Sequence, residues 1–352
     1  MIAKDTLSNT EKPLQCSAVI NATGPWTDLT RGKNPRAPKD EMLHCTKGIH
    51  VVLPQEKFPL KHAVALFHPR DKRVMFAIPW GDEAYLGTTD TFYEGMPEHV
   101  NASREDVDYL IEAAKDFFPG AQASRDDVIA TWSGLRPLLR PQHSKGKLMP
   151  SQMSREHELR MESPGFFSIA GGKLTTYRKM AKEVANEVVS WLHKEELLRS
   201  HPTVTQTKHK PLPGAVGWPK QGQGGIESDL LEQYGDFLSS KTASLLAQSY
   251  GVRSLSLMQH AVDQPGLLKA IVTGRAEIMA QVLWAVKEEF AVRLEDVLVR
   301  RTQLYFRESS QGLDAVEAVA TCMAELLHWS DEQKASEITH YRQLVSDNRH
   351  WV

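Results

Sequence analysis

The sequence predicts an α+β fold in the first part of the chain and an all-α domain in the last part. Up to about residue 170, short runs of β-branched and aromatic residues alternate with turn residues, which is typical of strands. Beyond residue 226, apolar residues recur at a spacing of three to four, the period of a helix. The segment between is dense in Pro, Gly, Thr and Lys. We therefore expect a first domain at 1–200, a linker at 201–226 and a helical domain at 227–352.

Six short runs in the first domain predict strands, because each is apolar and bounded by turn residues. They lie at residues 18–21, 49–53, 74–78, 85–88, 128–132 and 166–170. One helix interrupts them. Ser103 is suited to cap this helix, with Glu105 and Asp106 in its first turn, near the positive end of the helix dipole. The helical pattern ends at Pro119.

Helical periodicity returns after Gly171-Gly172, so we expect a helix that starts at or just after the two glycines. Its apolar face is formed by Met180, Val184, Val188 and Trp191. Further helices are predicted at 230–238, 243–250, 278–286 and 315–327. Ser330 begins a final helix, with Gln333 placed to complete a capping box.

Composition sets limits on compartment and partners. The 352 residues are 41% hydrophobic and 24% charged, enough for a substantial core, and the net charge of -2 gives no basic field for nucleic acid. Cys16, Cys45 and Cys322 are too scattered for a metal or redox pair, which favours a reducing compartment and no metal site. No apolar run approaches the ~20 residues that span a bilayer. We expect a cytoplasmic protein whose membrane contact, where it occurs, is peripheral.

The octamer VINATGPW at residues 19–26 runs from an apolar strand into small residues. Gly24 has no side chain, so the backbone here can approach a flat group closely. The alternative is an ordinary junction between a strand and a turn, where small residues are common. The octamer alone does not decide between the two.

A second segment, FFSIAGGKLTTYR at residues 166–178, reads as a strand, a glycine pair and a helix. The unpaired N–H groups of a helix start, together with the positive end of its dipole, suit a group that carries negative charge. The alternative role for Thr175 and Thr176 is that of simple helix caps.

Arg136 and His50 are the candidate polar groups for chemistry. Arg136 lies in TWSGLRPL, on a rigid loop that leaves a strand, and its planar, permanently charged guanidinium is suited to an anion or a developing alkoxide. It could equally form a surface ion pair. His50 lies in KGIHVV on a strand that can point it inward, and the ordinary pKa of histidine suits a base near neutral pH. With fourteen histidines in the chain, a structural role is its alternative.

Together these segments resemble the FAD-dependent glycerol-3-phosphate dehydrogenases of the D-amino-acid oxidase-like flavoprotein superfamily. The matching pieces are INATGPW at 20–26, KGIHVVLP at 47–54, FAIPWGDEAYLGTTDT at 76–91, TWSGLRPL at 131–138, SREH at 154–157, AGGKLTTYR at 170–178 and DVLVRRT at 296–302. They follow the family's order over nearly the whole chain. The resemblance implies a partial fold of this superfamily, with the mixed sheet of the substrate domain and the remainder of the FAD domain, followed by the all-α domain.

The resemblance implies FAD as the cofactor. In the family, the ATG strand, the Leu-Arg-Pro loop and the GGKLTT helix start contact the flavin. Here these positions are Ala22, Thr23, Gly24, Leu135, Gly171, Gly172, Lys173, Leu174 and Thr175. A helix start near the flavin would favour its reduction, because the reduced ring carries negative charge around N1 and the C2 carbonyl.

The implied reaction oxidises sn-glycerol 3-phosphate to dihydroxyacetone phosphate. The C2 hydride passes to flavin N5, and the electrons then leave to a quinone. The positions that match the family's substrate groups are His50, Arg136 and Lys173. On physical grounds, we expect His50 to remove the proton of the C2 hydroxyl, Arg136 to stabilise the alkoxide and Lys173 to neutralise the phosphate.

The sequence departs from the family at its start. Family members open with a strand, a GxGxxG turn and a helix that bind the ADP part of FAD, and this chain begins after that unit. Gly222-Gln223-Gly224-Gly225 does not replace it, because it follows no strand and lacks the last glycine. We therefore expect an incomplete FAD domain with exposed sheet edges, and whether Met1 begins the natural protein stays open.

Two other functions stay open at this stage. One is a truncated, non-catalytic remnant or interaction module without bound FAD. The other is a glycerol-3-phosphate oxidase that passes electrons to oxygen. The amphipathic helices of the last domain would suit homodimer contacts or peripheral membrane docking, and the Arg300-Arg301 pair would suit the catalytic domain, an anionic partner or a solvated face.

Overall fold

A computed structural model describes residues 1–141, 150, 153–198, 200, 204–349 and 351. The chain forms two compact units, which are described separately. The first unit consists of Met1–Ile49, Thr89–Val100 and Ser133–His209. The second unit consists of His50–Thr88, Asn101–Trp132 and Lys210–Val352.

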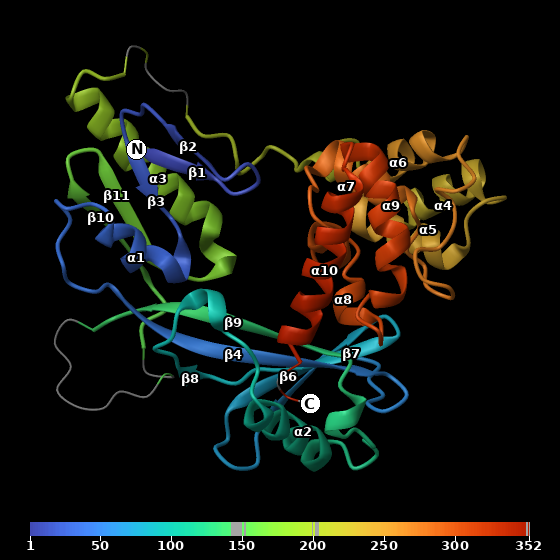
Figure 1. Cartoon of the computed structure of the whole chain (residues 1–352). Coiled ribbons are helices and arrows are strands. Elements are labelled where there is room, and N and C mark those ends of the chain that lie inside the picture. The colour runs from blue at the N-terminus through green and yellow to red at the C-terminus, as the bar shows by residue number, and fades with distance from the viewer. Residues whose placement is uncertain (142–149, 151–152, 199, 201–203, 350, 352) are drawn as a thin grey trace. The chain divides into compact units, whose positions relative to one another are not determined.

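A three-stranded sheet forms the centre of the first unit. Its order is β10 (His157–Ser163), β11 (Phe166–Gly171) and β3 (Val19–Asn21). β10 and β11 are antiparallel, whereas β11 and β3 run parallel. Helix α3 (Tyr177–Lys194) lies along this sheet, as Figure 1 shows. Its predicted apolar face is confirmed, because Val184 and Val188 pack with strand residues of the sheet.

A short 3₁₀ turn separates the two glycines from helix α3. Gly171 and Gly172 have φ angles of +75° and +90°, which lie outside the helical region. A 3₁₀ turn, η5 (Leu174–Thr176), follows, and α-helical geometry begins only at Tyr177. Helical backbone therefore begins just after the glycines, as predicted, but as a 3₁₀ turn, and the α-helix itself begins at Tyr177.

Shorter elements complete the first unit. They are the hairpin of β1 (Ile2–Asp5) and β2 (Thr10–Pro13), the 3₁₀ turns η1 (Gly24–Trp26) and η2 (Pro97–His99), helix α1 (Thr27–Gly32) and strand β8 (Thr91–Phe92). The β1–β2 hairpin and α1 are additions to the predicted elements.

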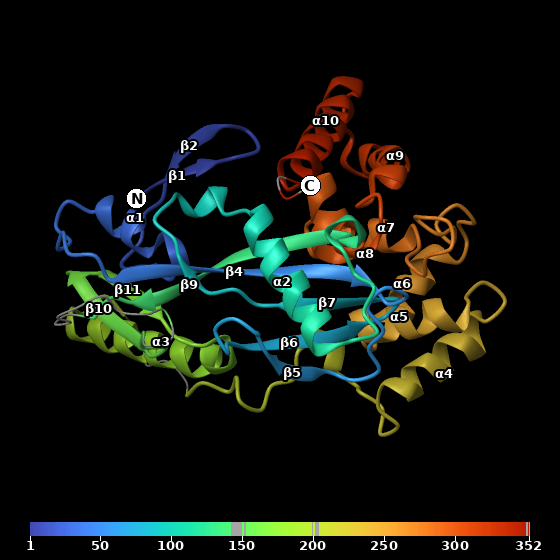
Figure 2. The ribbon, with the colours of Figure 1, turned by 90° about the horizontal axis from the view of Figure 1, so that it is seen from below.

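A larger sheet has six strands among the described residues. Its order is β5 (Val64–Phe67), β6 (Val74–Trp80), β7 (Glu83–Gly87), β4 (Leu43–Pro54) and β8, and β9 (Ala130–Leu139) also pairs with β4. β5, β6, β7 and β4 are antiparallel neighbours, which lie side by side in Figure 2. The boundary between the units falls inside β4 and inside β9.

Helix α2 (Arg104–Phe117) packs against β7 in the second unit. Its capping box is formed by Ser103 and Asp106, which confirms the predicted helix start. A second capping box at Ser124 and Asp127 begins the 3₁₀ turn η3 (Arg125–Asp127).

The last part of the chain is helical, as predicted. Its elements are η6 (Pro213–Ala215), α4 (Gln223–Tyr234), α5 (Ser240–Tyr250), α6 (Arg253–Ala261), α7 (Ala280–Glu289), the π-helical turn η7 (Asp296–Arg301), α8 (Leu304–Arg307), η8 (Leu313–Ala315), α9 (Val316–Leu327) and α10 (Asp331–Asp347). The predicted cap at Ser330 and Gln333 is confirmed. The predicted helix at 230–238 instead begins at Gln223 and ends at Tyr234.

Helix α7 joins two apolar cores of the second unit. Trp284 packs with α4, α5 and α6, while Val282 and Ala285 pack with α8, α9 and α10. This central position explains why both faces of α7 are buried. None of the helices in the described part of the chain has the length and apolar character needed to cross a membrane.

Glu308 directly follows α8 and is a buried carboxylate whose ionisation should make the stability of the protein depend on pH. It is 8% exposed, and its carboxylate accepts hydrogen bonds from the backbone N–H groups of Ser310 (3.0 Å) and Gly312 (3.1 Å). Burial works to raise the pKa of Glu308, but the hydrogen bonds from Ser310 and Gly312 outweigh it and lower the pKa below its ordinary value of 4.5. The stabilisation is therefore complete above 4.5 and is lost as the pH falls through the lower, folded pKa.

We expect Glu308→Gln to destabilise the protein near neutral pH by about 1–3 kcal/mol, because the backbone donors lose a charged acceptor. The difference from the wild type should shrink as the pH falls below 4.5. Urea unfolding at neutral and acidic pH measures both quantities, with Glu325→Gln at an exposed position as the control. A difference that is the same at both pH values would contradict the assignment.

Candidate functional site

The parallel pairing of β3 and β11 brings two of the predicted cofactor segments to one edge of a sheet. Because parallel strands end at the same edge, the turn after β3 and the turn after β11 are neighbours. Ala22 and Thr23 are exposed in the first turn. Lys173, Leu174 and Thr175 are exposed in the second turn. Ligands commonly bind at such an edge in open α/β sheets.

Asn21 fixes the turn that follows β3. Its side chain is 1% exposed, and its Oδ1 accepts a hydrogen bond of 2.7 Å from the Thr23 hydroxyl. Its Nδ2 donates to the Thr27 carbonyl at 3.0 Å and to Ser168 Oγ of β11 at 3.2 Å. One buried amide therefore holds the turn, the start of α1 and the neighbouring strand in a fixed arrangement.

The glycine pair at the end of β11 is favoured by its positive φ angles, and at Gly171 also by close packing against backbone. A Cβ atom on Gly171 would lie 2.4 Å from the Glu156 carbonyl oxygen, and one on Gly172 would lie 2.4 Å from the Met180 Cε. The Gly172 N–H donates to the same Glu156 carbonyl at 2.8 Å. The two glycines therefore turn the chain sharply and lead it to Lys173 at the sheet edge.

The hydroxyl groups of this turn do not cap α3. Neither η5 nor α3 has a side-chain hydrogen bond at its cap position, and the Thr176 hydroxyl instead donates to the Lys173 carbonyl at 2.9 Å. Since α3 begins at Tyr177, the 3₁₀ turn lies between its positive end and Lys173. The predicted contact between this turn and the cofactor stays a prediction.

The two turns fit the flat end of a flavin. The Leu174 side chain is 87% exposed, so it is accessible to a planar group at the sheet edge. A Cβ atom on Gly24 would meet nothing within 4 Å, and the same holds for Gly134 of β9. Leu174 can make apolar contact with a planar ring, and the two glycines leave their backbone accessible to it. The glycines at 222–225 do not offer a site for the dinucleotide end of FAD. Gly222 caps the start of α4 and does not follow a strand, as the glycine-rich turn of a dinucleotide-binding unit does.

Leu174 allows cofactor contact to be separated from stability. Exposed substitutions usually change stability by less than about 0.5 kcal/mol, so Leu174→Ala should leave the free energy of unfolding nearly unchanged. If a flavin covers this side chain, the variant should bind FAD about tenfold more weakly, since burying a leucine contributes about 1.5–3 kcal/mol. Quenching of FAD fluorescence measures the dissociation constant. Leu7→Ala, at a position that is 60% exposed, is the matched control, and equal affinities in both variants would remove Leu174 from the site.

Arg136 lies within strand β9, not on the loop that the sequence predicts. Its Nη1 lies 3.2 Å from Asp90 Oδ1 and donates to the Thr89 carbonyl at 3.3 Å. Asp90 has a side chain that is 5% exposed. The Thr89 hydroxyl accepts the Ile49 N–H of β4 at 3.1 Å. Thr89 and Asp90 therefore tie the guanidinium of β9 to β4, and the carboxylate partner fixes its orientation.

His50 occupies an aromatic surrounding in the second unit. Its ring stacks on Trp132 with a centroid distance of 4.8 Å and an interplanar angle of 21°. Tyr85 approaches it edge-on at 6.1 Å. His50 pairs with Gly87 across the sheet, and a Cβ atom on Gly87 would lie 2.1 Å from the imidazole Cδ2. The histidine is thus held between a glycine that leaves room for its ring and a tryptophan that packs against it.

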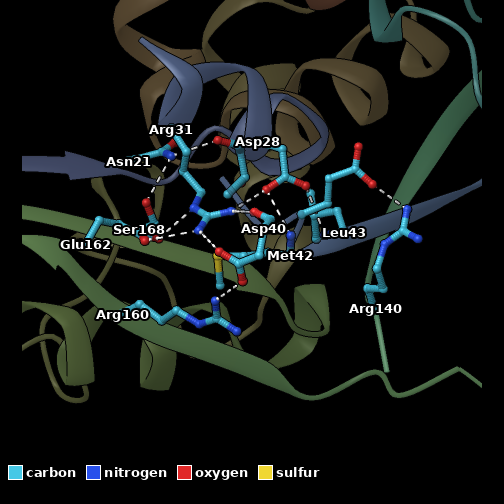
Figure 3. A network of polar contacts seen from close by, with 12 residues as sticks. Asn21, Asp28, Arg31, Asp40, Met42, Leu43, Arg140, Arg160, Glu162 and Ser168 are labelled. Carbon is cyan, nitrogen blue, oxygen red and sulfur yellow. Dashed lines mark hydrogen bonds and ion pairs between the residues drawn. The ribbon is translucent and has the colours of Figure 1, made fainter. Parts of the chain in front are cut away.

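A buried charged network supports the turn after β3 (Figure 3). Arg31 of α1 is 2% exposed, and its Nε donates to Glu162 Oε1 of β10 at 2.7 Å. The guanidinium also contacts Asp28 at 2.9 Å and Asp40 at 3.0 Å. Burial works to lower the pKa of Arg31, but the hydrogen bonds to Glu162, Asp28 and Asp40 outweigh it and raise the pKa above its ordinary value.

The same network reaches the start of β4. The Asp28 carboxylate accepts the backbone N–H groups of Met42 and Leu43, each at 3.0 Å. Asp40 also pairs with Arg160 of β10 at 2.8 Å. Helix α1, which follows the Ala22–Gly24 turn, is therefore tied to two strands of its unit.

A hollow of about 430 Å³ lies beside this region of the first unit. Pro25 of the turn after β3 and Leu135 of β9 both line it, together with Cys45 of β4. Burial raises the pKa of the Cys45 thiol to about 11. Cys45 is therefore a neutral thiol here. In the described part of the chain, no cluster of three or more His, Cys, Asp and Glu residues could hold a metal ion.

The predicted residues therefore fall into groups. The nine cofactor positions, which include Lys173, belong to the first unit together with Arg136, while His50 begins the second unit inside β4. The sequence interpretation assigned no role to Asp90 and Trp132, although both lie in motifs that it quoted. An acidic residue within GTTDT and a tryptophan directly before SGLRPL were the available signals.

Comparisons with known proteins agree with these observations. Residues 3–178 match the family described as FAD dependent oxidoreductase, and residues 205–334 match the C-terminal domain of alpha-glycerophosphate oxidase. The aerobic glycerol-3-phosphate dehydrogenase of Bacillus subtilis is 34% identical over 351 residues, which is 99% of this chain and 61% of the relative. The protein of the same name from Staphylococcus aureus is 33% identical over 347 residues, which is 98% of this chain and 60% of the relative.

The chain is also similar to a solved structure. The glycerol-3-phosphate dehydrogenase from Bacillus halodurans, in complex with FAD, has a TM-score of 0.81 and 31% identity. The match covers 98% of this chain and 65% of the other. The chain therefore spans about six-tenths of the length of the curated relatives that it matches. The α+β architecture with a helical C-terminal part is confirmed by these matches.

Proposed function

Because the chain belongs to the family of FAD-dependent oxidoreductases, we propose that it oxidises sn-glycerol 3-phosphate to dihydroxyacetone phosphate. The observation that carries this proposal is the meeting of two exposed, glycine-containing turns at one edge of the parallel β3–β11 pair. The names of the curated relatives support the substrate. The structure solved with FAD supports the cofactor.

The cofactor positions are the nine residues of the first unit that the resemblance implies. Ala22, Thr23 and Gly24 would hold the flavin from the turn after β3, Leu135 from β9, and Gly171 to Thr175 from the turn after β11. FAD, when bound, supplies the acceptor for the hydride that leaves C2 of the substrate. The polypeptide contributes orientation, exclusion of water and fixed charges.

Three side chains would act on the substrate. His50 would take the proton of the C2 hydroxyl, because a neutral imidazole is a competent base near neutral pH. Arg136, oriented by Asp90, would stabilise the negative charge that develops on the C2 oxygen. Lys173, exposed at the sheet edge, would neutralise the phosphate.

We infer three functional parts along the chain. Residues 1–200 would form the cofactor- and substrate-binding part, 201–226 a linker, and 227–352 the helical domain. The match of the C-terminal family to residues 205–334 is consistent with a separate helical part.

The electron acceptor and assembly are further proposals. We infer a quinone as acceptor, met at the membrane surface by peripheral contact, and a homodimer through the amphipathic helices. Oxygen is the competing acceptor, because the helical part matches the C-terminal domain of an oxidase. A third possibility is a protein without bound FAD.

Anaerobic spectroscopy separates these alternatives. The protein is purified with added FAD, alone and joined to a glycine-rich FAD-binding unit, and glycerol 3-phosphate is added without oxygen. The oxidised flavin band should bleach with glycerol 3-phosphate and persist with glycerol, which lacks the phosphate. A quinone should then restore the band without peroxide, whereas peroxide on admission of air indicates an oxidase. A colourless protein in both forms would remove the flavin assignment.

A further inference from the structure

The aromatic residues around His50 form a continuous cluster in the second unit. Trp132 is at its centre, stacked on His50 and in contact with Tyr85 at a centroid distance of 5.2 Å and with Trp80 at 6.0 Å. A fourth ring, Phe306, meets Trp132 edge-on at 5.5 Å with an interplanar angle of 80°. Phe306 belongs to helix α8 of the helical part and is distant in sequence from the other rings.

Helix α8 presents Phe306 from a firmly anchored position. Leu304 and Tyr305 are 0% and 4% exposed and pack into the core of α7, α9 and α10. Burial raises the pKa of Tyr305 to about 12. The π-helical turn η7 and a left-handed Gln303, with φ of +60°, precede α8. Such backbone features persist only where packing enforces them, and they are frequent at functional sites.

Arg307, the next residue of α8, fastens the same helix to the β6–β7 hairpin. Its guanidinium lies over the Trp80 ring at 5.2 Å, and its Nε donates to Glu83 Oε2 at 3.1 Å. The Glu83 side chain is 4% exposed and also accepts a bond of 2.6 Å from Arg275. A Cβ atom on Gly81 would lie 2.5 Å from Arg307 Nη2, so the hairpin leaves space for this arginine.

From these contacts we propose that Phe306 is a positioning residue for His50, acting by holding Trp132 flat against the imidazole. The inference rests on the proposed role of His50 as the base. Gly87 and Trp132 flank the imidazole from neighbouring strands, so its direction depends on where the tryptophan lies. Phe306 closes the side of Trp132 that faces α8. Through Phe306, the helical part thus contributes to the geometry of the proton acceptor.

Removing the Phe306 ring should let Trp132 tilt and His50 reorient. Small errors in the position of a reacting group are costly, so we expect kcat of Phe306→Ala to fall about ten- to hundredfold. KM should change little, because the phosphate is assigned to Lys173, whereas Phe306 acts through Trp132 on His50. Phe306→Tyr keeps the ring and should retain nearly wild-type kcat.

A spectroscopic measurement tests positioning without relying on activity. The imidazole of His50 lies on the face of Trp132, so its proton signals carry a ring-current shift that depends on the stacking. In ¹³C-histidine-labelled protein, the His50 signal is identified by its absence in His50→Gln. Phe306→Ala should move it toward the position of an unstacked histidine, while Phe306→Tyr should leave it in place. Loss of stability alone would not move this signal in protein that is still folded.

Phe290→Ala is the matched control, because this phenylalanine is 90% exposed on the same helical part. It should leave both the His50 signal and kcat unchanged. If Phe306→Ala does not fold, Phe306→Leu provides the same test with most of the apolar volume retained. An unmoved His50 signal, or an unchanged kcat in an active protein, would overturn the proposal. If the wild type does not oxidise glycerol 3-phosphate, the proposed function fails, and the His50 signal alone then decides whether Phe306 positions His50.

Discussion

Replacement of Arg31 by methionine should destabilise the protein by about 3–5 kcal/mol, because it leaves a buried carboxylate without its partner. The Arg31 and Glu162 side chains are 2% and 1% exposed, so water cannot take over the role of the guanidinium. Asp28 and Asp40 would lose the same partner. Urea unfolding followed by circular dichroism measures the change, and hydrogen exchange in β3 and β11 assigns it to the first unit.

Two further variants test the cause of this loss. Arg31→Met combined with Glu162→Gln should recover part of the stability, because no uncompensated charge remains buried. Arg160→Met is the control. Arg160 pairs with Asp40 and Glu158 but is 23% exposed, so its removal should cost less than about 1 kcal/mol. Equal losses in the Arg31 and Arg160 variants would contradict the importance of burial.

The second large effect is expected at His50. His50→Gln should lower kcat for glycerol 3-phosphate by about 10²- to 10⁴-fold, the usual contribution of a general base, while FAD affinity stays unchanged. Glutamine retains a polar group of similar size but cannot accept the proton. Stopped-flow flavin reduction measures the rate, and fluorescence quenching measures the affinity.

An exposed histidine of the same unit, His62, provides the control, and His62→Gln should behave as the wild type. Gly87→Ala offers an independent route to the same site, because its Cβ would collide with the His50 ring. It should lower kcat although His50 is still present. Unchanged reduction rates in both His50→Gln and Gly87→Ala would remove His50 from the mechanism.

Local sequence patterns predicted the features that depend on neighbouring residues in the chain, such as helix caps, an apolar helix face and several strands. The caps at Ser103 and Ser330 and the apolar face of α3 lie where the sequence placed them, and each of the six predicted strand runs overlaps an observed strand. Element ends were less accurate, since β4 and β9 continue through polar residues that have partners in the sheet. β10, with the sequence HELRMES, was missed because its charged residues hide the strand pattern. Its Glu162 is buried in an ion pair with Arg31 of α1, which the local sequence does not reveal.

The candidate site shows the same limit. The motifs identified nearly every residue named in the proposal, and the family match supports their use. They did not reveal that Asp90 orients Arg136 or that Trp132 packs on His50. Both are contacts between strands, and a motif records residue types without recording which neighbours they meet.

The sequence by itself determined the family, many of the strands and helices and the chemical types of residue at the candidate site, because these follow from motifs and from short-range periodicity. Only the tertiary structure decided which distant segments meet. Asn21 bonds Ser168, 147 residues away, and this parallel pairing sets the two turns at one edge. Phe306 reaches Trp132 in the same way. Such contacts depend on the packing of whole elements, which no local pattern encodes.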